Sequence, residues 1–451
     1  MSSSSEIVTA SALTRHSSLT EWLNYMQQIH VSAIDMGLSR VLPVAERLGL
    51  IHSAQNDTYV FTVAGTNGKG STTAVISAIC QAAGYKTALY QSPHLSVFNE
   101  RVRINGAMVS DHTLVDAFVK VEAARLYCEL TLSFFEMTTL AALLIFAEAD
   151  CKVWVLEVGL GGRLDVVNII DPDMAVITNI SIDHVDWLGD NVEAIGAEKA
   201  GILRPNISLI YGALEMPNSV QNLVDSHQVS CFQVGRDFSY REIEPDLWQY
   251  SNAAVTLQLP RPALSLMNTA NALSAVLASP LKIDIEAIEQ ALMTVKLAGR
   301  FDYRECHTRH WLFDVAHNEQ GVAFLLNQLL PFWQHYLARH THSERQDNKA
   351  LSVKVLFSML ADKDIDKVVQ LLSQADLPIS EWFIAPIDYP RAATTAQLLE
   401  TLARYVTKED IKQYASLADA TQAAIEASQP QDLILVCGSF HTIAEALNAL
   451  A

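Results

Sequence analysis

The chain has 451 residues, half of them hydrophobic, and a formal net charge of −19. This length predicts two or three domains with well-filled cores, and the hydrophobic content argues against a mainly disordered chain. The acidic balance argues against nucleic acid or an anionic membrane as the principal partner, because both require clustered Lys and Arg. No apolar run approaches the ~20 residues of a membrane span. The six cysteines form no C-x-x-C pair, so we expect buried thiols in a reducing cytoplasm.

The N-terminal segment predicts a short polar leader followed by helices. Residues 1–17 are Ser-rich and lack the apolar core of a signal peptide, so we expect a flexible leader. Leu19–Ile29 and Leu42–Leu48 show the apolar spacing of helices. The segment between them, Asp35–Leu38, indicates by itself only a connection between helices.

The stretch Tyr59–Thr73 predicts a strand, a glycine-rich loop and a helix. Tyr59–Ala64 is apolar, β-branched and aromatic, as in a buried strand, and Thr72–Ala83 has helical character with Gly84 as its stop. The sequence GTNGKGS lies between them at residues 65–71. Its glycines let backbone N–H groups turn toward a phosphate, and Lys69 can reach the outer phosphates.

This loop differs from the generic P-loop, which would have Gly at Val63 and a hydroxyl residue at Gly70. A hydroxyl from Ser71 or Thr72 can still face a magnesium ion. A glycine turn that binds nothing is the alternative, and the flanking strand and helix together with Lys69 disfavour it.

A second loop of functional character follows the strand Lys86–Tyr90. It contains S-P-H-L at Ser92–Leu95 and then N-E-R-V-R-I at Asn99–Ile104. Because Pro93 bars a helix, we expect a loop at the end of a strand. Such loops are where α/β proteins bind ligands.

The helix Met137–Ala149 begins with a capping signal. Ser133 is a suitable N-cap and Glu136 completes a capping box, which is a full explanation of this pair. Phe134 and Phe135 would then be ordinary core residues.

A carboxylate interrupts the apolar strand Val153–Val158. Burying Glu157 there is costly unless it is paired or bound to a metal. The segment GLGGRLDVVN follows at residues 159–168, and its glycines permit the close approach of a ligand. Asp183 and His184 follow the next strand, Asp173–Asn179. Such a pair usually only solvates a loop, but with Glu157 at the preceding strand end it suggests a metal site.

The rest of the chain alternates strands and helices again. Residues 207–260 contain strand-like runs and a polar stretch without an assignment, and Asn268–Ser279 is helical. From Gly299 the pattern restarts, with a helix from Gln320 and a polar surface insertion at Thr341–Lys349. The predicted strands of this part are Trp311–Val315, Val353–Ser358, Trp382–Ala385 and Leu433–Cys437. This alternation predicts a second parallel sheet.

Together these motifs resemble those of the Mur ligase superfamily and, within it, of the folylpolyglutamate synthase and dihydrofolate synthase family. The matching segments run from about residue 34 to residue 442 and are D-x-G-L, GTNGKGS, SPHL, NERVRI, SFFE, EVGLGGRLDVVN, DVAHN and CGSFHT. The resemblance implies an α/β fold with a P-loop-type, parallel-sheet nucleotide domain followed by a smaller Rossmann-like domain. After the leader expected at 1–17, it implies a Mur-ligase-type ATP-binding central domain at 18–298 and a C-terminal glutamate-ligase domain at 299–451.

The resemblance also implies the site residues. It assigns the nucleotide to Thr66, Asn67, Gly68, Lys69, Gly70, Ser71, Asn268, Arg300 and Asp314. It assigns magnesium to Ser92, Glu157, His184 and Lys199. It assigns the pteroate to Asp35, Met36, Gly37, Leu38, Ser133, Phe134, Phe135, Glu136, Leu164, Asp165 and Val166, and we favour Phe135 for stacking on the pterin.

Three of these residues, Lys69, Lys199 and His184, would be catalytic. A lysine on a helix is ordinarily solvated, but Lys199 matches a family position that reacts with carbon dioxide to give a carbamate. Two positions depart from the family pattern: Val166 stands where Ala is more usual, and Asp302 stands where the family has Gln. The second exchange puts a contact with the nucleotide base in doubt.

The activity implied is an ATP-dependent amide ligase acting through an acyl phosphate. It would add L-glutamate to 7,8-dihydropteroate, forming dihydrofolate, and to reduced folates, forming folylpolyglutamates. ATP, two magnesium ions and a monovalent cation would assist. We expect a cytoplasmic monomer without nucleic-acid or membrane partners.

Four alternatives remain open from the sequence. The chain could be a folylpolyglutamate synthase only, or a Mur-type peptidoglycan ligase. The latter normally carries a further N-terminal domain, whereas only about 60 residues precede the loop here. A regulatory nucleotide switch would not need Glu157, His184 and Lys199. A Rossmann oxidoreductase is disfavoured because no G-x-G-x-x-G occurs at Gly65.

Overall fold

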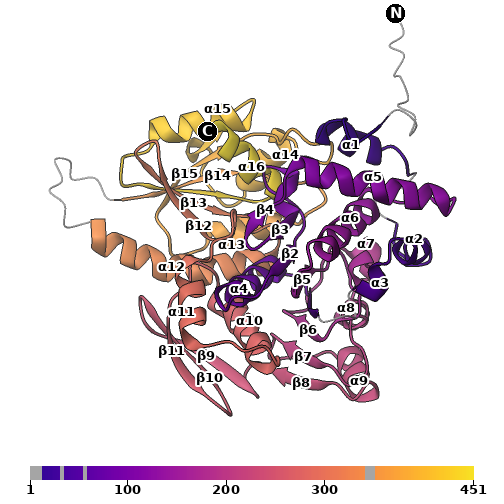
Figure 1. Cartoon of the computed structure of the whole chain (residues 1–451). Helices are drawn as coiled ribbons and strands as arrows, with labels where there is room; N and C mark the ends of the chain where they lie inside the picture. The colour runs from indigo at the N-terminus through magenta and orange to yellow at the C-terminus, as the bar shows by residue number, and fades with distance from the viewer. Residues whose placement is uncertain (1–12, 31–34, 54–57, 341–350) are drawn as a thin grey trace, which may run out of the picture. The chain divides into compact units, whose positions relative to one another are not determined.

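The computed structural model describes residues 13–30, 35–53, 58–340 and 351–451. The chain divides into two compact units (Figure 1). Unit 1 comprises Met1–Pro262 and Leu266–Val295, and unit 2 comprises Ala263–Ser265 and Lys296–Ala451. The domain assignment with a boundary between residues 298 and 299 remains a prediction. Residues 1–12 of the expected leader and the expected insertion at 341–349 lie outside the described residues.

Unit 1 is built on an eight-stranded sheet with the order β4-β3-β2-β5-β1-β6-β7-β8. Its strands are β1 (Tyr59–Ala64), β2 (Thr87–Tyr90), β3 (Val102–Ile104), β4 (Ala107–Met108), β5 (Val153–Glu157), β6 (Met174–Ile177), β7 (Ser208–Tyr211) and β8 (Ser230–Gln233). The six strands from β2 to β8 in this order pair in parallel, and the hairpin of β3 and β4 adds an antiparallel edge. The carboxyl ends of β2, β5, β1 and β6 therefore meet at one edge of the sheet.

Helices flank this sheet. They are α1 (Leu19–Met26), α2 (Val41–Arg47), α3 (Leu50–Ser53), α4 (Lys69–Ala82), α5 (Asp111–Tyr127), α6 (Phe134–Glu148), α7 (Val185–Leu188), α8 (Val192–Ala200), α9 (Asn218–Ser226), α10 (Leu266–Ala278) and α11 (Ile285–Thr294). α4 packs against β1, β2 and β5 and against α10 and α11, while α6 packs against α5.

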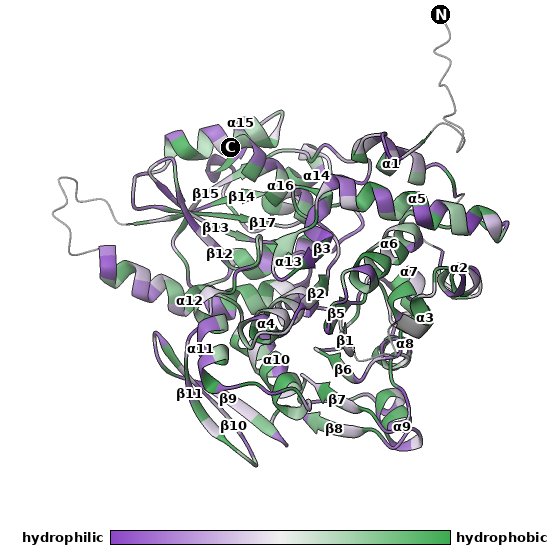
Figure 2. Ribbon diagram, viewed as in Figure 1, coloured by the Kyte–Doolittle hydropathy of each residue, from purple (hydrophilic) through white to green (hydrophobic). Residues whose placement is uncertain are grey.

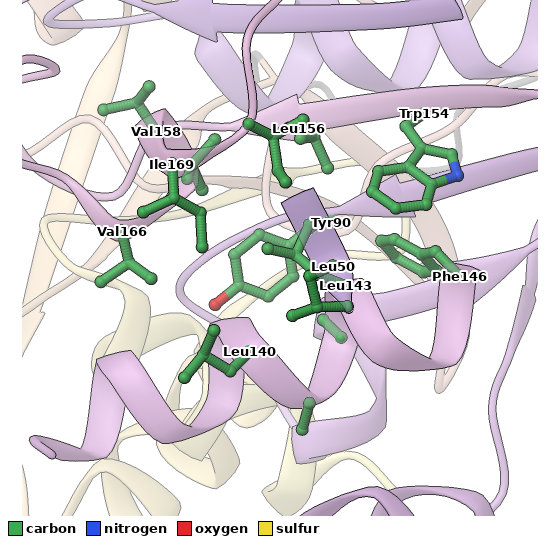
Figure 3. Packing of buried hydrophobic residues seen from close by; sticks show 14 of the residues in the cluster. Leu50, Tyr90, Leu140, Leu143, Phe146, Trp154, Leu156, Val158, Val166 and Ile169 are labelled. Atoms are coloured by element: carbon green, nitrogen blue, oxygen red, sulfur yellow. The ribbon is translucent and has the colours of Figure 1, made fainter. Parts of the chain in front are cut away.

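The two-residue period of the strands explains how both faces of the sheet are covered. Tyr90, Trp154 and Leu156 belong to one buried cluster with Leu143 and Phe146 of α6 (Figure 3). The intervening strand residues are also buried, on the face against which α4 packs. A sheet buried on both faces requires the continuous apolar runs seen at β1 and β5.

The polar stretch that had no assignment forms a separate antiparallel sheet with the order β11-β10-β9. Its strands are β9 (Phe238–Glu244), β10 (Leu247–Asn252) and β11 (Thr256–Pro260). Trp248 and Tyr250 are buried, and the Tyr250 hydroxyl lies 2.9 Å from Ser274 Oγ of α10. Most of β9 after Phe238 is exposed, and the remaining residues of β10 are only half-buried, so the polar character of these strands hid them.

Unit 2 contains a six-stranded sheet with the order β12-β13-β17-β14-β15-β16. Its elements are β12 (Asp302–Cys306), β13 (Arg309–Asp314), α12 (Glu319–His340), β14 (Val353–Phe357), α13 (Ile365–Ser373), β15 (Ile379–Ile384), α14 (Thr395–Leu402), β16 (Ile411–Gln413), α15 (Leu417–Ala427), β17 (Leu433–Cys437) and α16 (Phe440–Ala449). All neighbours pair in parallel except β12 with β13. β14 and β17 are buried throughout, and β17, at the centre of the sheet order, is hydrophobic along its length (Figure 2).

The α/β class, with a P-loop-type sheet followed by a smaller α/β unit, is confirmed. Several predicted helix boundaries were wrong by about three residues. The helix after the glycine loop begins at Lys69 rather than Thr72, because the last loop residues already form its first turn, and the first helix ends at Met26 rather than Ile29. β12 and β16 were not predicted. Within the described residues, no helix combines the length and apolarity needed to cross a membrane.

Candidate active site

Four of the predicted segments come together at the carboxyl edge of the unit 1 sheet. Gly65 follows β1, Ser92 follows β2, Glu157 ends β5, and Asp183 and His184 follow β6. A pocket here is lined by Gly65, Thr66, Lys69, Val158, Gly159, Leu160, Gly161, Asp183, His184, Leu188 and Lys199. The glycine loop, the segment after β5 and Lys199 of α8 thus surround one cavity.

The glycine loop, residues 65–71, needs glycine at two positions for space and conformation. Gly65 has φ +146°, and a Cβ there would lie 1.9 Å from Thr178 Oγ1. Gly68 has φ +84°, and a Cβ there would lie 2.2 Å from Asn268 Oδ1. Asn268 is buried, and its Oδ1 has no hydrogen-bond partner in the described structure. Both neighbours therefore pack directly on the loop backbone.

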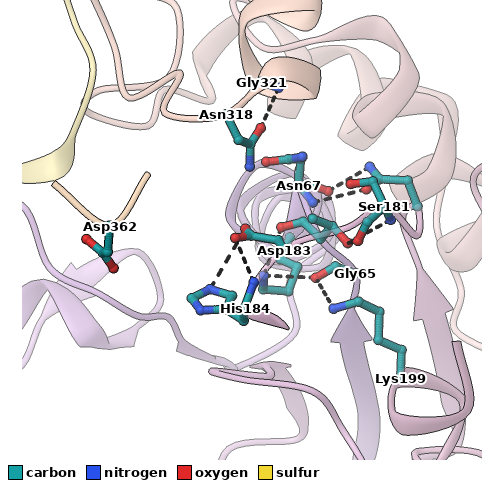
Figure 4. Close-up of polar contacts among 12 residues, drawn as sticks. Gly65, Asn67, Ser181, Asp183, His184, Lys199, Asn318, Gly321 and Asp362 are labelled. Atoms are coloured by element: carbon teal, nitrogen blue, oxygen red, sulfur yellow. Dashed lines mark hydrogen bonds and ion pairs between the residues drawn. The ribbon is translucent and has the colours of Figure 1, made fainter. Parts of the chain in front are cut away.

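The segment after β6 fastens the glycine loop (Figure 4). The Asn67 N–H donates to Asn179 Oδ1 at 3.0 Å, and the Asn67 carbonyl accepts from Thr178 Oγ1 at 2.6 Å and from Asn179 Nδ2 at 2.9 Å. Thr66 Oγ1 donates to the Ser181 carbonyl at 3.1 Å. Side chains of Thr178 and Asn179 thus hold the loop backbone at Asn67, and the Thr66 side chain bonds the backbone of Ser181.

α4 begins at Lys69 without a side-chain cap. Its first intrahelical hydrogen bond runs from Thr72 N–H to the Gly68 carbonyl, so the preceding N–H groups point out of the helix end. Lys69 Nζ donates to the carbonyls of Gly65 at 3.0 Å and Thr66 at 3.3 Å. A cation at an uncapped helix N-terminus is suited to an anion such as a phosphate.

Lys199 is a buried lysine, 4% exposed, at the end of α8. Its Nζ donates to the Gly65 carbonyl at 3.0 Å. Burial, with a further contribution from the nearby Lys69, lowers the pKa of Lys199 to about 7, and Asp183 partly opposes both effects. A large neutral fraction near pH 7 makes the amine a nucleophile, which is what carbamate formation requires.

The predicted magnesium ligands are brought together in part. The Ser92 N–H lies 3.4 Å from Glu157 Oε2, and Glu157 is 5% exposed. His184 and Lys199 line the pocket, and the His184 N–H donates to Asp183 Oδ1 at 2.9 Å. Among the described residues, no three His, Cys, Asp or Glu side chains gather closely enough to hold a metal ion. The predicted set contains only two such side chains, so the magnesium assignment stays a prediction.

Asp35 and Glu136, predicted for the pteroate, are joined by one arginine. Arg40 Nη1 lies 2.9 Å from Asp35 Oδ2, and Arg40 Nη2 lies 2.7 Å from Glu136 Oε1. The capping box is present as expected: the Ser133 N–H donates to Glu136 Oε2 at 2.6 Å, and the Glu136 N–H donates to Ser133 Oγ at 3.3 Å. Glu136 therefore caps α6 and pairs with Arg40 at the same time.

The two phenylalanines occupy different surroundings. Phe134 is half-buried and packs edge-to-face on the core residue Phe98, with the ring centres 6.0 Å apart. Phe135 lies against Gly159, where a Cβ would come within 2.5 Å of its ring. Since Gly159 lines the pocket, Phe135 is the ring nearer to it, in line with the preference for Phe135.

Of the D-x-G-L segment, the side chain of Met36 comes closest to the pocket wall, since a Cβ on Gly161 would lie 3.4 Å from its Cε. Gly37 has φ +148° and open space around its Cα, and Leu38 packs on the core. The pteroate assignment of this segment stays a prediction.

Asp165 acts within its own loop. Its Oδ2 accepts from the N–H groups of Gly159 at 3.0 Å and Leu160 at 2.9 Å, and its Oδ1 accepts from Val167 N–H at 2.9 Å. Burial raises the pKa of Asp165 to about 6, although these three bonds oppose the shift. Leu164 is half-buried and Val166 is in the core, so all three predicted residues support the loop that lines the pocket.

Arg300 and Asp314 lie in unit 2. The Arg300 guanidinium lies 4.7 Å from the centre of the Phe440 ring. Asp314 accepts from the N–H groups of Phe301 at 2.8 Å and Ala316 at 3.0 Å, and burial raises its pKa. Asp302, which replaces the family Gln, pairs with Arg304 at 2.7 Å, so its charge is balanced within the same strand.

Sequence reasoning missed several supporting residues. Thr178, Asn179 and Ser181 hold the glycine loop, and they could have been found because polar residues stand at the carboxyl end of a predicted buried strand and just after it. Gln91 was also missed; its Nε2 donates to the Gly70 carbonyl at 2.8 Å. Arg40 gave no signal, since its partners are 5 and 96 residues away.

Comparison with known proteins supplies the family. Residues 63–278 match the Mur ligase middle domain, and residues 299–440 match the Mur ligase glutamate ligase domain. A dihydrofolate synthase/folylpolyglutamate synthase of Escherichia coli K12 is 39% identical over 437 residues, covering 96% of both chains. The chain belongs to the dihydrofolate synthase/folylpolyglutamate synthase family. This membership sets aside the peptidoglycan ligase, the nucleotide switch and the oxidoreductase.

Solved structures of this family agree in fold over nearly the whole chain. The E. coli FolC in complex with DHPP and ADP has a TM-score of 0.86 at 38% identity, covering 97% of this chain and 98% of that one. A bifunctional folylpolyglutamate synthase/dihydrofolate synthase with Mn, AMPPNP and L-glutamate bound has a TM-score of 0.85 at 36% identity, covering 97% and 99%.

Proposed function

We propose that this chain is an ATP-dependent ligase that joins L-glutamate to the carboxyl group of 7,8-dihydropteroate and of reduced folates. The observation that carries the proposal is the single pocket in which the glycine loop, Lys69, Lys199 and the Gly159 segment meet. Family membership supports the choice of substrates, because related structures hold DHPP with ADP, or AMPPNP with L-glutamate.

The reaction needs two steps. A carboxylate oxygen of the folate attacks the γ-phosphorus of ATP, which gives an acyl phosphate and ADP. The neutral amine of glutamate then attacks the acyl carbon, inorganic phosphate leaves, and the amine proton passes to solvent. Lys69 and the N-terminus of α4 would stabilise the charge that develops on the transferred phosphoryl group.

The side chains present fit a divalent ion in chemical type. Glu157 offers a buried carboxylate beside the Ser92 backbone, and His184 offers an imidazole at the pocket. Lys199 would contribute only as a carbamate, and its lowered pKa favours the neutral amine from which a carbamate forms. Magnesium, when bound, neutralises phosphate charge. We propose that the enzyme binds two magnesium ions and one monovalent cation.

We place the pterin ring at Phe135, because this ring borders the Gly159 wall of the pocket. A folylpolyglutamate synthase without the dihydropteroate activity is the second candidate. We also propose that the protein is a cytoplasmic monomer whose partners are small molecules. All six cysteines are free thiols, which supports a reducing compartment.

The test is ADP release with ATP, magnesium and L-glutamate, comparing dihydropteroate with tetrahydrofolate. Release with both supports the bifunctional enzyme, and release with tetrahydrofolate alone supports the second candidate. The Lys69→Ala variant is expected to abolish ADP formation with either substrate. Turnover at the unaltered rate in this variant would refute the role of the glycine loop, and light scattering would check the monomer.

A further inference from the structure

The N-E-R triplet, Asn99–Arg101, has no role in the reaction proposed above. It lies in the 3-10 turn η2 (Phe98–Arg101), directly before β3. The loop before it, Ser92–Val97, carries a predicted magnesium ligand but belongs to no helix or strand. Such a loop needs side chains from elsewhere to fix its shape.

Glu100 supplies three of these contacts with one carboxylate. Its Oε2 accepts from Leu95 N–H at 2.8 Å, and its Oε1 accepts from Ser96 N–H at 2.8 Å and from Val97 N–H at 2.9 Å. Three successive amides of the loop thus point at one side chain. A carboxylate can accept at both oxygens, whereas a glutamine amide can accept at only one.

Arg101 holds the loop on its other side. Its Nε–H donates to His94 Nδ1 at 2.9 Å, and its carbonyl accepts from Gln91 N–H at 3.0 Å. A guanidinium has donors only, so His94 Nδ1 must be the acceptor in this bond. The contact thereby holds the His94 ring in one orientation. The Arg101 guanidinium also lies 5.4 Å from the centre of the Phe98 ring. Three positions of the chain, Gln91, His94 and Phe98, therefore contact this one arginine.

The loop held in this way brings the Ser92 N–H to 3.4 Å from Glu157 Oε2. Residues 91 and 94 are tied to Arg101, and residues 95–97 are tied to Glu100. Ser92 lies between these anchors, so its place beside Glu157 depends on them. Asn99 differs, because its Nδ2 donates to the Val109 carbonyl at 2.9 Å and to Asp111 Oδ1 at 2.8 Å, on the far side of the hairpin.

We propose that Glu100 and Arg101 are positioning residues that set the divalent-ion site by holding Ser92 beside Glu157. This inference deepens the proposed function and rests on its assignment of Ser92 and Glu157 to magnesium. The neighbouring Asn99 only fastens the hairpin to α5, so the same turn provides a matched control.

The direct test measures Mn²⁺ affinity by EPR titration in the presence of a non-hydrolysable ATP analogue. Glu100→Ala and Arg101→Lys are expected to weaken Mn²⁺ binding by roughly 10- to 100-fold, the usual cost of removing a residue that orients a metal ligand. Glu100→Gln should fall between wild type and Glu100→Ala, since it keeps one acceptor oxygen. Asn99→Ala is expected to lower Tm but to bind Mn²⁺ as wild type does.

A double variant decides whether the two residues act through Ser92. Ser92→Ala should weaken Mn²⁺ binding by itself, and Glu100→Ala in that background should add little further loss. Full additivity, or a Glu100→Ala protein with wild-type Mn²⁺ affinity and only a lower Tm, would overturn the proposal. Since metal affinity is measured without turnover, a failure of the ligase assay would count against the proposed function and leave this test readable.

Discussion

Lys69 and Lys199 donate to the same acceptor, the carbonyl oxygen of Gly65, and each Nζ lies 3.0 Å from it. Burial lowers the pKa of Lys199, the more buried of the two, to about 7, and the repulsion between two ammonium groups at one oxygen contributes to this shift. One lysine belongs to the glycine loop and the other to α8, so the charge on Lys69 and the protonation of Lys199 are linked.

Removing Lys69 should raise the pKa of Lys199. In Lys69→Met the burial of Lys199 remains, so its pKa should rise but stay below the ordinary value of 10.5. Competitive acetylation followed by mass spectrometry across pH 6–10 would measure the shift. The expected outcome is slower labelling of Lys199 at pH 7 in Lys69→Met than in wild type, and equal labelling curves would contradict the linkage.

Lys199 should also make stability depend on pH. Its pKa is about 7 in the folded protein and 10.5 as the ordinary value, so the unfolded chain binds more protons between these limits. The contribution of Lys199 to the free energy of unfolding therefore rises with pH from about 7 to 10.5. Below pH 7 this lysine destabilises the folded protein to its full extent. Lys199→Met is expected to flatten this part of the curve in urea melts, and a slope unchanged from wild type would refute it.

Asp165 should give the opposite slope at lower pH. Its pKa is about 6 in the folded protein and 3.8 as the ordinary value, so the folded protein binds more protons between them. Stability thus falls through this group as pH rises from 3.8 to about 6. Asp165→Asn should remove this slope and also lose hydrogen bonds to Gly159 or Val167, at a cost of about 1–3 kcal/mol. Chemical denaturation at pH 4, 5 and 6 measures both effects.

Gly68→Ala should damage nucleotide binding. The new Cβ would lie 2.2 Å from Asn268 Oδ1, and the residue would keep a φ of +84°. Strain of this kind costs about 1–3 kcal/mol, and the loop would have to move to relieve it. We expect weaker ADP binding by calorimetry. Gly84→Ala is the control, since Gly84 has a similar φ of +87° but open space around it, and it should lose stability without losing ADP affinity.

Gly159→Ala should act on the pterin. The added methyl would lie 2.5 Å from the Phe135 ring, so the ring must move away from its present position at the pocket wall. KM for dihydropteroate should rise, while KM for ATP should change little. Phe134→Leu is a suitable comparison because Phe134 packs against Phe98 in the core, and it should lower Tm more than it alters KM.

The sequence predicted the sheet of unit 1 well because its strands are buried on both faces and read as apolar runs, as at Tyr59–Ala64. It failed at Phe238–Glu244, where only part of one face is buried and charged residues fill the rest. The site motifs identified which residues matter, but not how they are used. Asp165 accepts hydrogen bonds from its own loop. Arg40 pairs with Glu136, which lies 96 residues further along the chain, and a local sequence pattern cannot reveal such a contact.

The segment after β6 both holds the glycine loop by hydrogen bonds and carries the candidate metal-site residues. Thr178 and Asn179 hold Asn67, and only a few residues later Asp183 and His184 line the pocket. If bound phosphates displace the loop, the segment between Asn179 and His184 would carry this displacement to His184. Nucleotide binding and divalent-ion binding are therefore coupled, and each ligand is expected to change the protein's affinity for the other by the same factor.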